Sequence, residues 1–216
     1  MMTTLLPVIE TFSSIQGEST HAGKRCFFIR LAGCNLRCVY CDTTYAWTGG
    51  EMRSLDALTR AAVASGMETV ELTGGEPLLH DAVPQLTQML LDAGLEVLIE
   101  TNGSLDIGVL PDGCCRIVDC KLPASGMADR NLCANYELLT PRDEVKFVVS
   151  SREDFDWAFA VIDRYKLAEK TPHLIFSPVW GKVGFEELAG WVVQCRRPVR
   201  MQLQLHKMIW GDKKGV

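Results

Sequence analysis

Short runs of apolar and β-branched residues recur along the chain and alternate with segments of helical periodicity. The runs span residues 25–31, 69–73, 95–100, 116–120, 145–149, 173–177 and 199–205. Unbroken apolar runs of this length are typical of strands buried on both faces, as in parallel sheets covered by helices. The alternation therefore predicts an α/β fold whose strands end at a common edge.

Four segments between or after these runs place apolar side chains at helical spacing. They span residues 54–65, 81–94, 152–165 and 185–195. We expect Ser54 to cap the first helix and Gly94 to end the second. A complete eight-stranded βα barrel usually needs about 250 residues, whereas this chain has 216. We therefore predict a partial, open βα barrel with about six mainly parallel strands and a reduced set of helices.

The composition predicts one domain over residues 1–216. Hydrophobic residues make up 47% of the chain and the net charge is -5. Because the balance is acidic and no dense basic run occurs, we expect no nucleic-acid partner. The sequence contains no stretch of about 20 apolar residues and no basic segment leading into a long apolar one near its start. We accordingly predict a cytoplasmic protein without a membrane partner.

Three of the nine cysteines, Cys34, Cys38 and Cys41, lie within eight residues directly after the first predicted strand. This C-x3-C-x2-C spacing lets three thiolates converge on one centre. A structural zinc ion would want a fourth ligand, which the isolated His21 could supply only in principle. A 4Fe-4S cluster held by three thiolates leaves one iron open to a small molecule. The loop therefore predicts a catalytic iron–sulfur cluster.

Further motifs follow the next predicted strands. They are TGGEP at 73–77, ETNGS at 100–104 and DCK at 119–121. Ligands of open parallel sheets bind beyond the carboxyl ends of the strands, so we expect these motifs to lie near the cysteine loop. Taken singly, the first two are compatible with ordinary turns, and Lys121 could reach solvent instead of a ligand.

The loop CNLRCVYC, residues 34–41, resembles the cysteine loop of the radical S-adenosylmethionine (SAM) superfamily. The resemblance implies that SAM binds the fourth iron and is cleaved to methionine and a 5'-deoxyadenosyl radical, which abstracts hydrogen from the substrate. It makes Cys34, Cys38 and Cys41 the catalytic cluster ligands. The cofactor-binding residues that it implies are Tyr40, Asp42, Gly74, Gly75, Glu76, Glu100, Asn102, Asp119, Lys121, Ser177 and Pro178.

An N-terminal segment, about residues 8–30, brings an amide, a carboxylate and a guanidinium close to the cysteine loop in sequence. Gln16, Glu18 and Arg30 suit a nitrogen-rich heterocycle that carries a carboxylate, because amide and carboxylate pair with ring donors and acceptors. Arg30 can hold a carboxylate through two parallel hydrogen bonds. The alternative for Arg30 is a structural ion pair near a strand end.

The chain as a whole is similar to the 7-carboxy-7-deazaguanine synthases, a radical SAM family of queuosine-precursor biosynthesis. The similarity rests on SIQGE, the cysteine loop, TGGEP, DCKLP, DEVKFVV and LQLHK. It implies a lyase that converts 6-carboxy-5,6,7,8-tetrahydropterin to 7-carboxy-7-deazaguanine with ring contraction and loss of ammonia. The substrate residues that it implies are Ile15, Gln16, Gly17, Glu18, Arg30, Thr73 and His206.

The same resemblance implies further components of the system. Mg2+ would bind through the Thr43 hydroxyl, and Mg2+ needs few protein ligands because it keeps several waters. A C-terminal segment, about residues 199–212, would close over the substrate. An electron donor such as flavodoxin or ferredoxin would reduce the cluster, and the enzyme would form a homodimer.

Two other interpretations stay open at this point. A glycyl-radical-enzyme activase also resembles the cysteine loop, the GGEP turn and the D-x-K strand end, but it would take a partner polypeptide. It would need neither the SIQGE segment nor LQLHK. A non-enzymatic iron–sulfur or zinc protein is disfavoured by the missing fourth thiolate and by the GGEP turn.

The chain departs from the family pattern at two places, Ser19 and Cys120, and neither departure touches the cluster ligands. The cysteines outside the loop other than Cys120 show no metal-like spacing, and we expect them to act as small buried hydrophobes. These are Cys26, Cys114, Cys115, Cys133 and Cys195.

Overall fold

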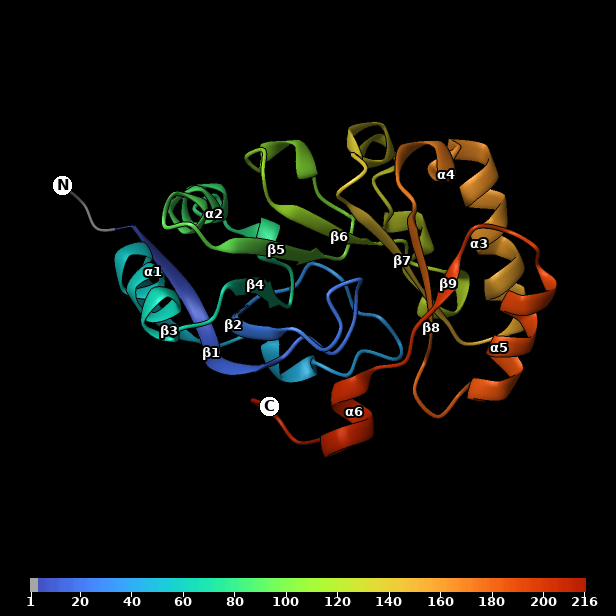
Figure 1. Ribbon diagram of the computed structural model, residues 1–216, viewed down its shortest axis with the longest axis horizontal. Coiled ribbons are helices and arrows are strands. Elements are labelled where there is room, and N and C mark those ends of the chain that lie inside the picture. The colour runs from blue at the N-terminus through green and yellow to red at the C-terminus, as the bar shows by residue number, and fades with distance from the viewer. Residues whose placement is uncertain (1–3) are drawn as a thin grey trace.

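The computed structural model describes residues 4–216, which build one nine-stranded sheet in the order β3-β1-β2-β4-β5-β6-β7-β8-β9 (Figure 1). The parallel strands are β2 (Arg25–Leu31), β4 (Thr69–Gly74), β5 (Glu96–Thr101), β6 (Cys115–Asp119), β7 (Glu144–Val149), β8 (His173–Pro178) and β9 (Arg200–Met201). The end strands β3 and β9 each pair with a single neighbour, so the sheet stays open. The prediction of a partial βα barrel is confirmed.

Two antiparallel strands at one edge of the sheet were not predicted from the sequence. They are β1 (Leu5–Ile15), which pairs with β2, and β3 (Glu51–Ser54), which pairs with β1. Most of β1 is only half-buried and it contains Pro7, and β3 is short, polar and exposed, so neither matches the pattern of a strand buried on both faces. Together with the seven predicted runs, which become β2 and β4 to β9, these two make nine strands, so the expected count of about six is corrected to nine.

The strand predicted at 199–205 is shorter than expected, because β9 ends at Met201. Beyond it, the side chain of Gln202 donates a hydrogen bond to the carbonyl of Ser19, and that of Gln204 donates one to Glu18. The chain then enters helix α6 (Leu205–Trp210). These contacts tie the C-terminal segment to the connection between β1 and β2.

Helices cover the outer face of the sheet in two groups (Figure 1). The groups are α1 (Leu55–Ala64) with α2 (Val83–Asp92), and α3 (Arg152–Tyr165) with α4 (Leu167–Lys170) and α5 (Phe185–Gln194). As the sequence predicts, Ser54 caps α1 by accepting a hydrogen bond from the Ala57 amide at 3.2 Å, and Gly94 follows α2 with a φ of +81°. Short 3-10 helices in the connections are η1 (Thr44–Ala46), η2 (Pro77–Leu79), η3 (Ile107–Val109), η4 (Pro123–Ser125), η5 (Ala128–Arg130) and η6 (Cys133–Leu138).

Side chains alternate between the two faces of each strand. In β4, Val70 and Leu72 belong to the core under α1 and α2, whereas Glu71 and Thr73 line a cavity on the inner face. The two-residue period of a strand thus lets the same strands hold an apolar core outside and polar side chains inside. The inner face is where the candidate site lies.

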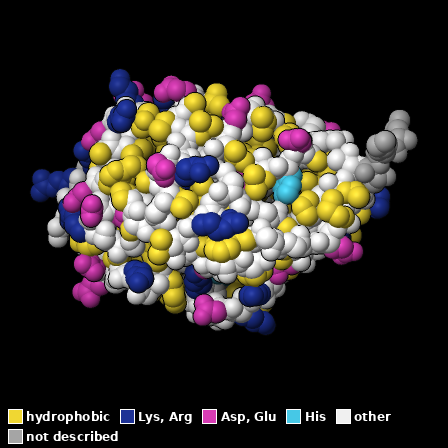
Figure 2. Space-filling view, turned by 180° about the vertical axis from the view of Figure 1, so that it is seen from behind, with side chains coloured by type: hydrophobic (Ala, Val, Ile, Leu, Met, Phe, Trp, Pro, Cys, Tyr) yellow, Lys and Arg dark blue, Asp and Glu magenta, His cyan; other side chains and the backbone are white. Residues whose placement is uncertain are grey.

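The face of the molecule drawn in Figure 2 shows no broad field of one charge among the described residues. Seen from behind, acidic and basic side chains are interspersed among apolar ones (Figure 2). Among residues 4–216, no helix has the length and apolar character needed to cross a membrane.

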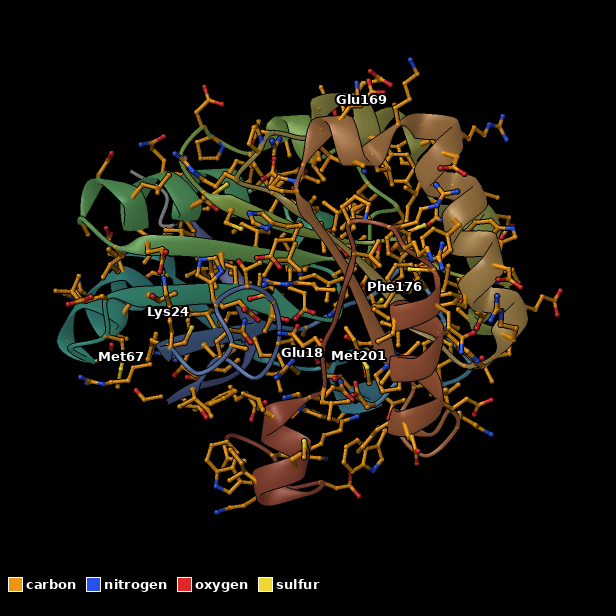
Figure 3. All side chains as sticks on the ribbon, turned by 45° about the vertical axis from the view of Figure 1, so that its right-hand side comes forward. Glu18, Lys24, Met67, Glu169, Phe176 and Met201 are labelled. Carbon is orange, nitrogen blue, oxygen red and sulfur yellow. The ribbon has the colours of Figure 1, made fainter. Side chains whose placement is uncertain are left out.

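The core under α3 and α5 is centred on Phe176 of β8, which is fully buried (Figure 3). Its ring lies 4.9 Å from that of Phe147 and 5.0 Å from that of Phe155. We predict that Phe176→Ala lowers the free energy of unfolding by about 3–5 kcal/mol, because it removes a buried ring and leaves a cavity. Phe185→Ala, at a side chain 37% exposed, should cost about 1 kcal/mol or less. Urea denaturation of both variants measures the difference, and equal losses would contradict this account of the core.

Candidate active site

A cavity of about 250 Å³ lies on the inner face of the sheet, towards the carboxyl ends of the strands. It collects side chains from strands, from the cysteine loop, from the β1–β2 connection and from α6. The predicted site residues that line it are Ile15, Gln16, Gly17, Glu18, Arg30, Cys34, Cys38, Tyr40, Cys41, Asp42, Thr43, Thr73, Gly74, Gly75, Glu100, Asn102, Asp119, Lys121, Ser177, Pro178 and His206. Glu76 is the one predicted site residue that does not line the cavity.

The three-cysteine loop follows β2 directly and turns on Gly33, whose φ is +96°. The amide of Cys41 donates to the carbonyl of Cys38 at 3.2 Å, which keeps the loop tight. Cys34, Cys38 and Cys41 all line the cavity. Three thiolates can each bind a different iron of a 4Fe-4S cluster, which leaves the fourth iron open to a small molecule.

The glycine pair at the end of β4, Gly74 and Gly75, packs against this loop. A Cβ atom on Gly74 would collide with the backbone of Leu31, and one on Gly75 would collide with the carbonyl of Gly33. The amides of Gly75 and Glu76 donate to the carbonyls of Leu31 and Gly33, at 3.2 and 2.7 Å. The glycines therefore allow the TGGEP turn to lie directly against the start of the cysteine loop.

Glu76 is fully buried and supports the neighbouring strand end. Its carboxylate accepts hydrogen bonds from the Asn102 amide at 2.6 Å and from the Thr101 hydroxyl at 2.8 Å. Burial, opposed by these hydrogen bonds, raises the pKa of the Glu76 carboxyl to about 7. The Asn102 side chain in turn lies 3.8 Å from the Cys34 sulfur. Glu76 thus positions Asn102 beside the cluster loop, while its predicted contact with SAM stays a prediction.

Lys146 of β7 stands at the centre of the cavity's charges and was missed by sequence reasoning. Its ammonium, on a side chain 5% exposed, lies 3.0 Å from Glu18, 3.5 Å from Asp119 and in contact with Glu100. Burial lowers the pKa of Lys146, but these carboxylates outweigh it, so the pKa lies well above its ordinary value. The sequence does contain a sign of this role, because Lys146 is the single charged residue in the apolar run VKFVV.

Glu71 of β4 is a second unpredicted member of the site. It is 2% exposed, and its carboxyl accepts a hydrogen bond from the Gln16 side chain. Burial and the nearby Glu100 raise the pKa of Glu71 well above its ordinary value, against the opposing charge of Lys146. Glu71 can therefore carry a proton in the cavity and donate a hydrogen bond to a ligand.

The β1–β2 connection, residues 16–24, contacts inward-facing side chains of β4 and β7 and meets the C-terminal segment. The amide of Leu205 donates to the Gly17 carbonyl at 2.9 Å, and the side chain of Gln204 donates to Glu18 at 2.7 Å. Figure 3 shows Glu18 close to the end of β9. A Cβ on Gly17 would collide with the His206 ring, so the glycine permits this contact.

Arg30 forms a structural ion pair and also lines the cavity, where it could meet a substrate carboxylate. Its Nε donates to Glu10 at 2.8 Å, and the Tyr45 hydroxyl donates to the same carboxylate oxygen at 2.8 Å. The guanidinium also lies 5.9 Å from the ring centres of Phe12 and Tyr45. The structural ion pair is present, and it fixes an arginine that lines the cavity.

A polar group next to the third cysteine joins the loop to α6. The hydroxyl of Thr43 donates to Asp42 at 2.9 Å, and Lys207 forms an ion pair with the same carboxylate. Burial raises the pKa of Asp42, but Lys207 and the hydrogen bond from Thr43 reverse this, and the net pKa lies below its ordinary value. Lys207 is a further residue that sequence reasoning missed.

Comparisons with known proteins agree with this geometry. Residues 28–190 match the Radical SAM superfamily, and the chain belongs to it. The 7-carboxy-7-deazaguanine synthase of Chlorobaculum tepidum is 43% identical, over 98% of this chain and 97% of that protein. That of Clostridium acetobutylicum is 38% identical, over 97% of this chain and 98% of that protein. The chain belongs to the 7-carboxy-7-deazaguanine synthase family.

A solved structure shows the same fold. The crystal structure of QueE from Escherichia coli matches with a TM-score of 0.73 at 24% identity, over 94% of this chain and 95% of that one. The prediction of a radical SAM enzyme of this family is confirmed, in preference to the activase and to a non-enzymatic protein. The superfamily implies a 4Fe-4S cluster and SAM, and the roles of individual residues stay predictions.

The buried charge cluster around Lys146 gives a test of the site's construction. We predict that Lys146→Met lowers the free energy of unfolding by about 3–5 kcal/mol, because it leaves three carboxylates without their shared cation. Lys170→Met removes a lysine paired with the largely exposed Glu137 and should cost less than about 1 kcal/mol. Chemical denaturation at neutral pH compares them; a Lys146 variant as stable as the control would show that the cluster holds no shared cation.

Proposed function

We propose that this chain converts 6-carboxy-5,6,7,8-tetrahydropterin to 7-carboxy-7-deazaguanine by a ring contraction with loss of ammonia; the name of its relatives gives the product of this reaction. The observation that carries the proposal is the convergence of the three-cysteine loop and of inward-facing amide, carboxylate and ammonium groups on one cavity. The 16–24 connection and the C-terminal segment border this cavity and are hydrogen-bonded to each other. A small heterocycle suits such a site better than a polypeptide segment does.

The cofactors would occupy the side of the cavity next to the cysteine loop. Cys34, Cys38 and Cys41 would hold the 4Fe-4S cluster, which together with SAM supplies, when bound, a radical able to abstract hydrogen from the substrate. Asn102 contacts Cys34 and would face the cofactor there. The proposed SAM residues are Tyr40, Asp42, Gly74, Gly75, Glu76, Glu100, Asn102, Asp119, Lys121, Ser177 and Pro178.

The substrate would bind between the 16–24 connection and the inner face of the sheet. Carboxylate and amide oxygens of Glu18 and Gln16 accept hydrogen bonds, which suits the N–H groups of a fused pyrimidine ring. Lys146 and a protonated Glu71 offer donors to its carbonyl and ring nitrogens. Arg30 is held by Glu10 and would face the substrate carboxylate. The proposed substrate residues are Ile15, Gln16, Gly17, Glu18, Arg30, Thr73 and His206, with Glu71 and Lys146 added.

Mg2+ would bind beside the cysteine loop. The Thr43 hydroxyl and the Asp42 carboxylate both line the cavity, and hard oxygen donors are the ligands that Mg2+ prefers. Lys207 neutralises Asp42, which leaves the neutral Thr43 oxygen and a substrate carboxylate to complete the metal's surroundings.

The function has a direct test. The anaerobically reconstituted protein, supplied with SAM, a reductant, Mg2+ and the pterin acid, should form 7-carboxy-7-deazaguanine and 5'-deoxyadenosine, measured by mass spectrometry. Cys34→Ala should abolish both products, because the cluster loses a ligand. Cleavage of SAM with the pterin acid left unchanged would refute the proposed substrate while leaving the superfamily assignment in place.

The metal role has a separate test. Thr43→Ala should reduce the stimulation of turnover by Mg2+ about tenfold or more, because the hydroxyl ligand is lost, while SAM cleavage without substrate is spared. Thr44→Ala, at an exposed neighbour outside the cavity, is the matched control. Turnover of the unaltered enzyme that is equal with and without Mg2+ would remove the metal from the proposal.

The remaining expectations concern the surroundings of the enzyme. A flavodoxin- or ferredoxin-type electron donor, a homodimeric assembly and a cytoplasmic location stay predictions.

A further inference from the structure

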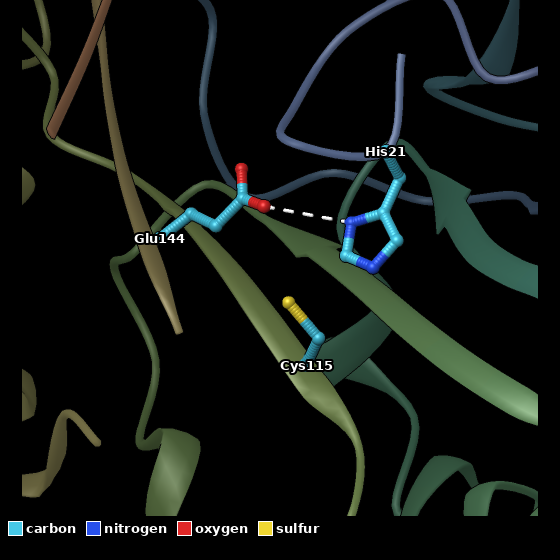
Figure 4. A group of neighbouring side chains, drawn as sticks. All are labelled: His21, Cys115 and Glu144. Carbon is cyan, nitrogen blue, oxygen red and sulfur yellow. Dashed lines mark ion pairs between the residues drawn. The ribbon is translucent and has the colours of Figure 1, made fainter. Parts of the chain in front are cut away.

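A second group of possible metal ligands lies away from the candidate active site. His21 in the 16–24 connection, Cys115 at the start of β6 and Glu144 at the start of β7 each direct one donor atom to a common point (Figure 4). These atoms all lie within 4.8 Å of one another. The cysteine loop follows the carboxyl end of β2, whereas this group lies at the amino ends of the parallel strands, so the two sites occupy opposite edges of the sheet.

We propose that His21, Cys115 and Glu144 form a binding site for a divalent transition-metal ion, zinc in particular. One imidazole nitrogen, one thiolate and one carboxylate form a donor set typical of zinc, with a fourth position left for water. The site is additional to the proposed function and does not depend on it.

The distances suit a single ion. Nδ1 of His21 lies 3.5 Å from Oε1 of Glu144. Around tetrahedral zinc, with bonds of about 2.0–2.1 Å, a nitrogen and an oxygen ligand would be about 3.3 Å apart. The site is also sheltered, because Cys115 is 4% exposed and Glu144 is fully buried. A small inward movement of the side chains would complete the coordination.

The histidine ring is oriented as a metal ligand would be. Its Nε2 lies 3.2 Å from Glu96, which is itself held by the Lys24 ammonium at 3.0 Å and the Thr69 hydroxyl at 2.6 Å. Metal-binding histidines commonly donate their second N–H to such a carboxylate, which fixes the tautomer. With the proton on Nε2, Nδ1 of His21 presents a lone pair to the lone pairs of Glu144. That arrangement is repulsive unless a cation, or a second proton on the ring, lies between them.

The carboxylate is oriented from the other side. The backbone amide of Thr20 lies 3.0 and 3.1 Å from the two oxygens of Glu144, and the Thr20 hydroxyl donates to the same group. These donors fix the position of Glu144, and the Thr20 hydroxyl, which contacts Oε1, also lies 3.4 Å from Nδ1 of His21. A carboxylate with such support keeps its geometry when a metal binds.

Charge and proton balance favour the ion as well. As a thiol, Cys115 donates to the Arg142 carbonyl at 3.1 Å. Metal binding would form an S–metal bond and release that proton to solvent, with no redox change. A dication with one thiolate and one carboxylate is neutral overall, which limits the cost of burying these charges. The sequence hides the group because its members are 94 and 29 positions apart, 21 to 115 and 115 to 144.

The experiment uses the anaerobically reconstituted enzyme with its cluster in place. Zinc is titrated in, bound zinc per chain is measured by mass spectrometry, and X-ray absorption is recorded at the zinc edge, where iron does not interfere. We expect one zinc per chain, with one sulfur at about 2.3 Å and nitrogen or oxygen ligands at about 2.0–2.1 Å. Cys115→Ala and His21→Gln should each weaken zinc binding at least tenfold. Cys114→Ala, at the adjacent buried cysteine, should leave binding unchanged.

Several outcomes would overturn the proposal. Zinc below about a tenth of an equivalent per chain at micromolar free zinc would do so, as would affinity unchanged in both His21→Gln and Cys115→Ala. Zinc with three sulfur neighbours would place the ion in the cysteine loop instead. If nitrogen NMR shows protons on both ring nitrogens of His21 in the zinc-treated enzyme, an imidazolium pairs with Glu144 and no metal ion binds there.

Discussion

The parallel pairing of β2 with β4, and of each following strand up to β8, is the constraint on which the candidate site depends. It brings the carboxyl ends of six strands to one edge, so segments distant in sequence meet there. The close approach of β4 to the start of the cysteine loop adds a local condition, because Gly74 and Gly75 leave no room for a Cβ atom. Any larger residue at these positions would push the loop away from the cavity.

The interior of the barrel is built for binding at the expense of stability. Lys146 is 5% exposed and its three carboxylate partners are 13–29% exposed, and ion pairs so far removed from water regain little of their desolvation cost. Helices α1 to α5 cover an apolar core on the other face of the same strands, which stabilises the fold. Because side chains alternate between the two faces of each strand, the residues that stabilise the fold lie on one face and the residues of the candidate site lie on the other.

The 16–24 connection links otherwise separate parts of the molecule. At its start, Gln16 and Glu18 face the cavity, and Gly17 meets α6. At its far end, Thr20 and His21 reach Glu144 at the amino ends of the strands. A metal ion bound there would hold the connection against β6 and β7, and would thereby stabilise the position of the proposed substrate residues.

The sequence by itself determined the strand runs of β2 and of β4 to β8, the four longer helices and the cysteine loop, because these depend on local patterns: apolar period, capping residues and ligand spacing. It also indicated the family through motifs that follow strand ends. Only the tertiary structure decided the antiparallel pairing of β1 with β2 and β3, the central place of Lys146 and Glu71, and the meeting of His21 with Cys115 and Glu144. These features depend on which face of a strand a side chain occupies and on contacts between distant segments. A one-dimensional pattern carries too little information about either.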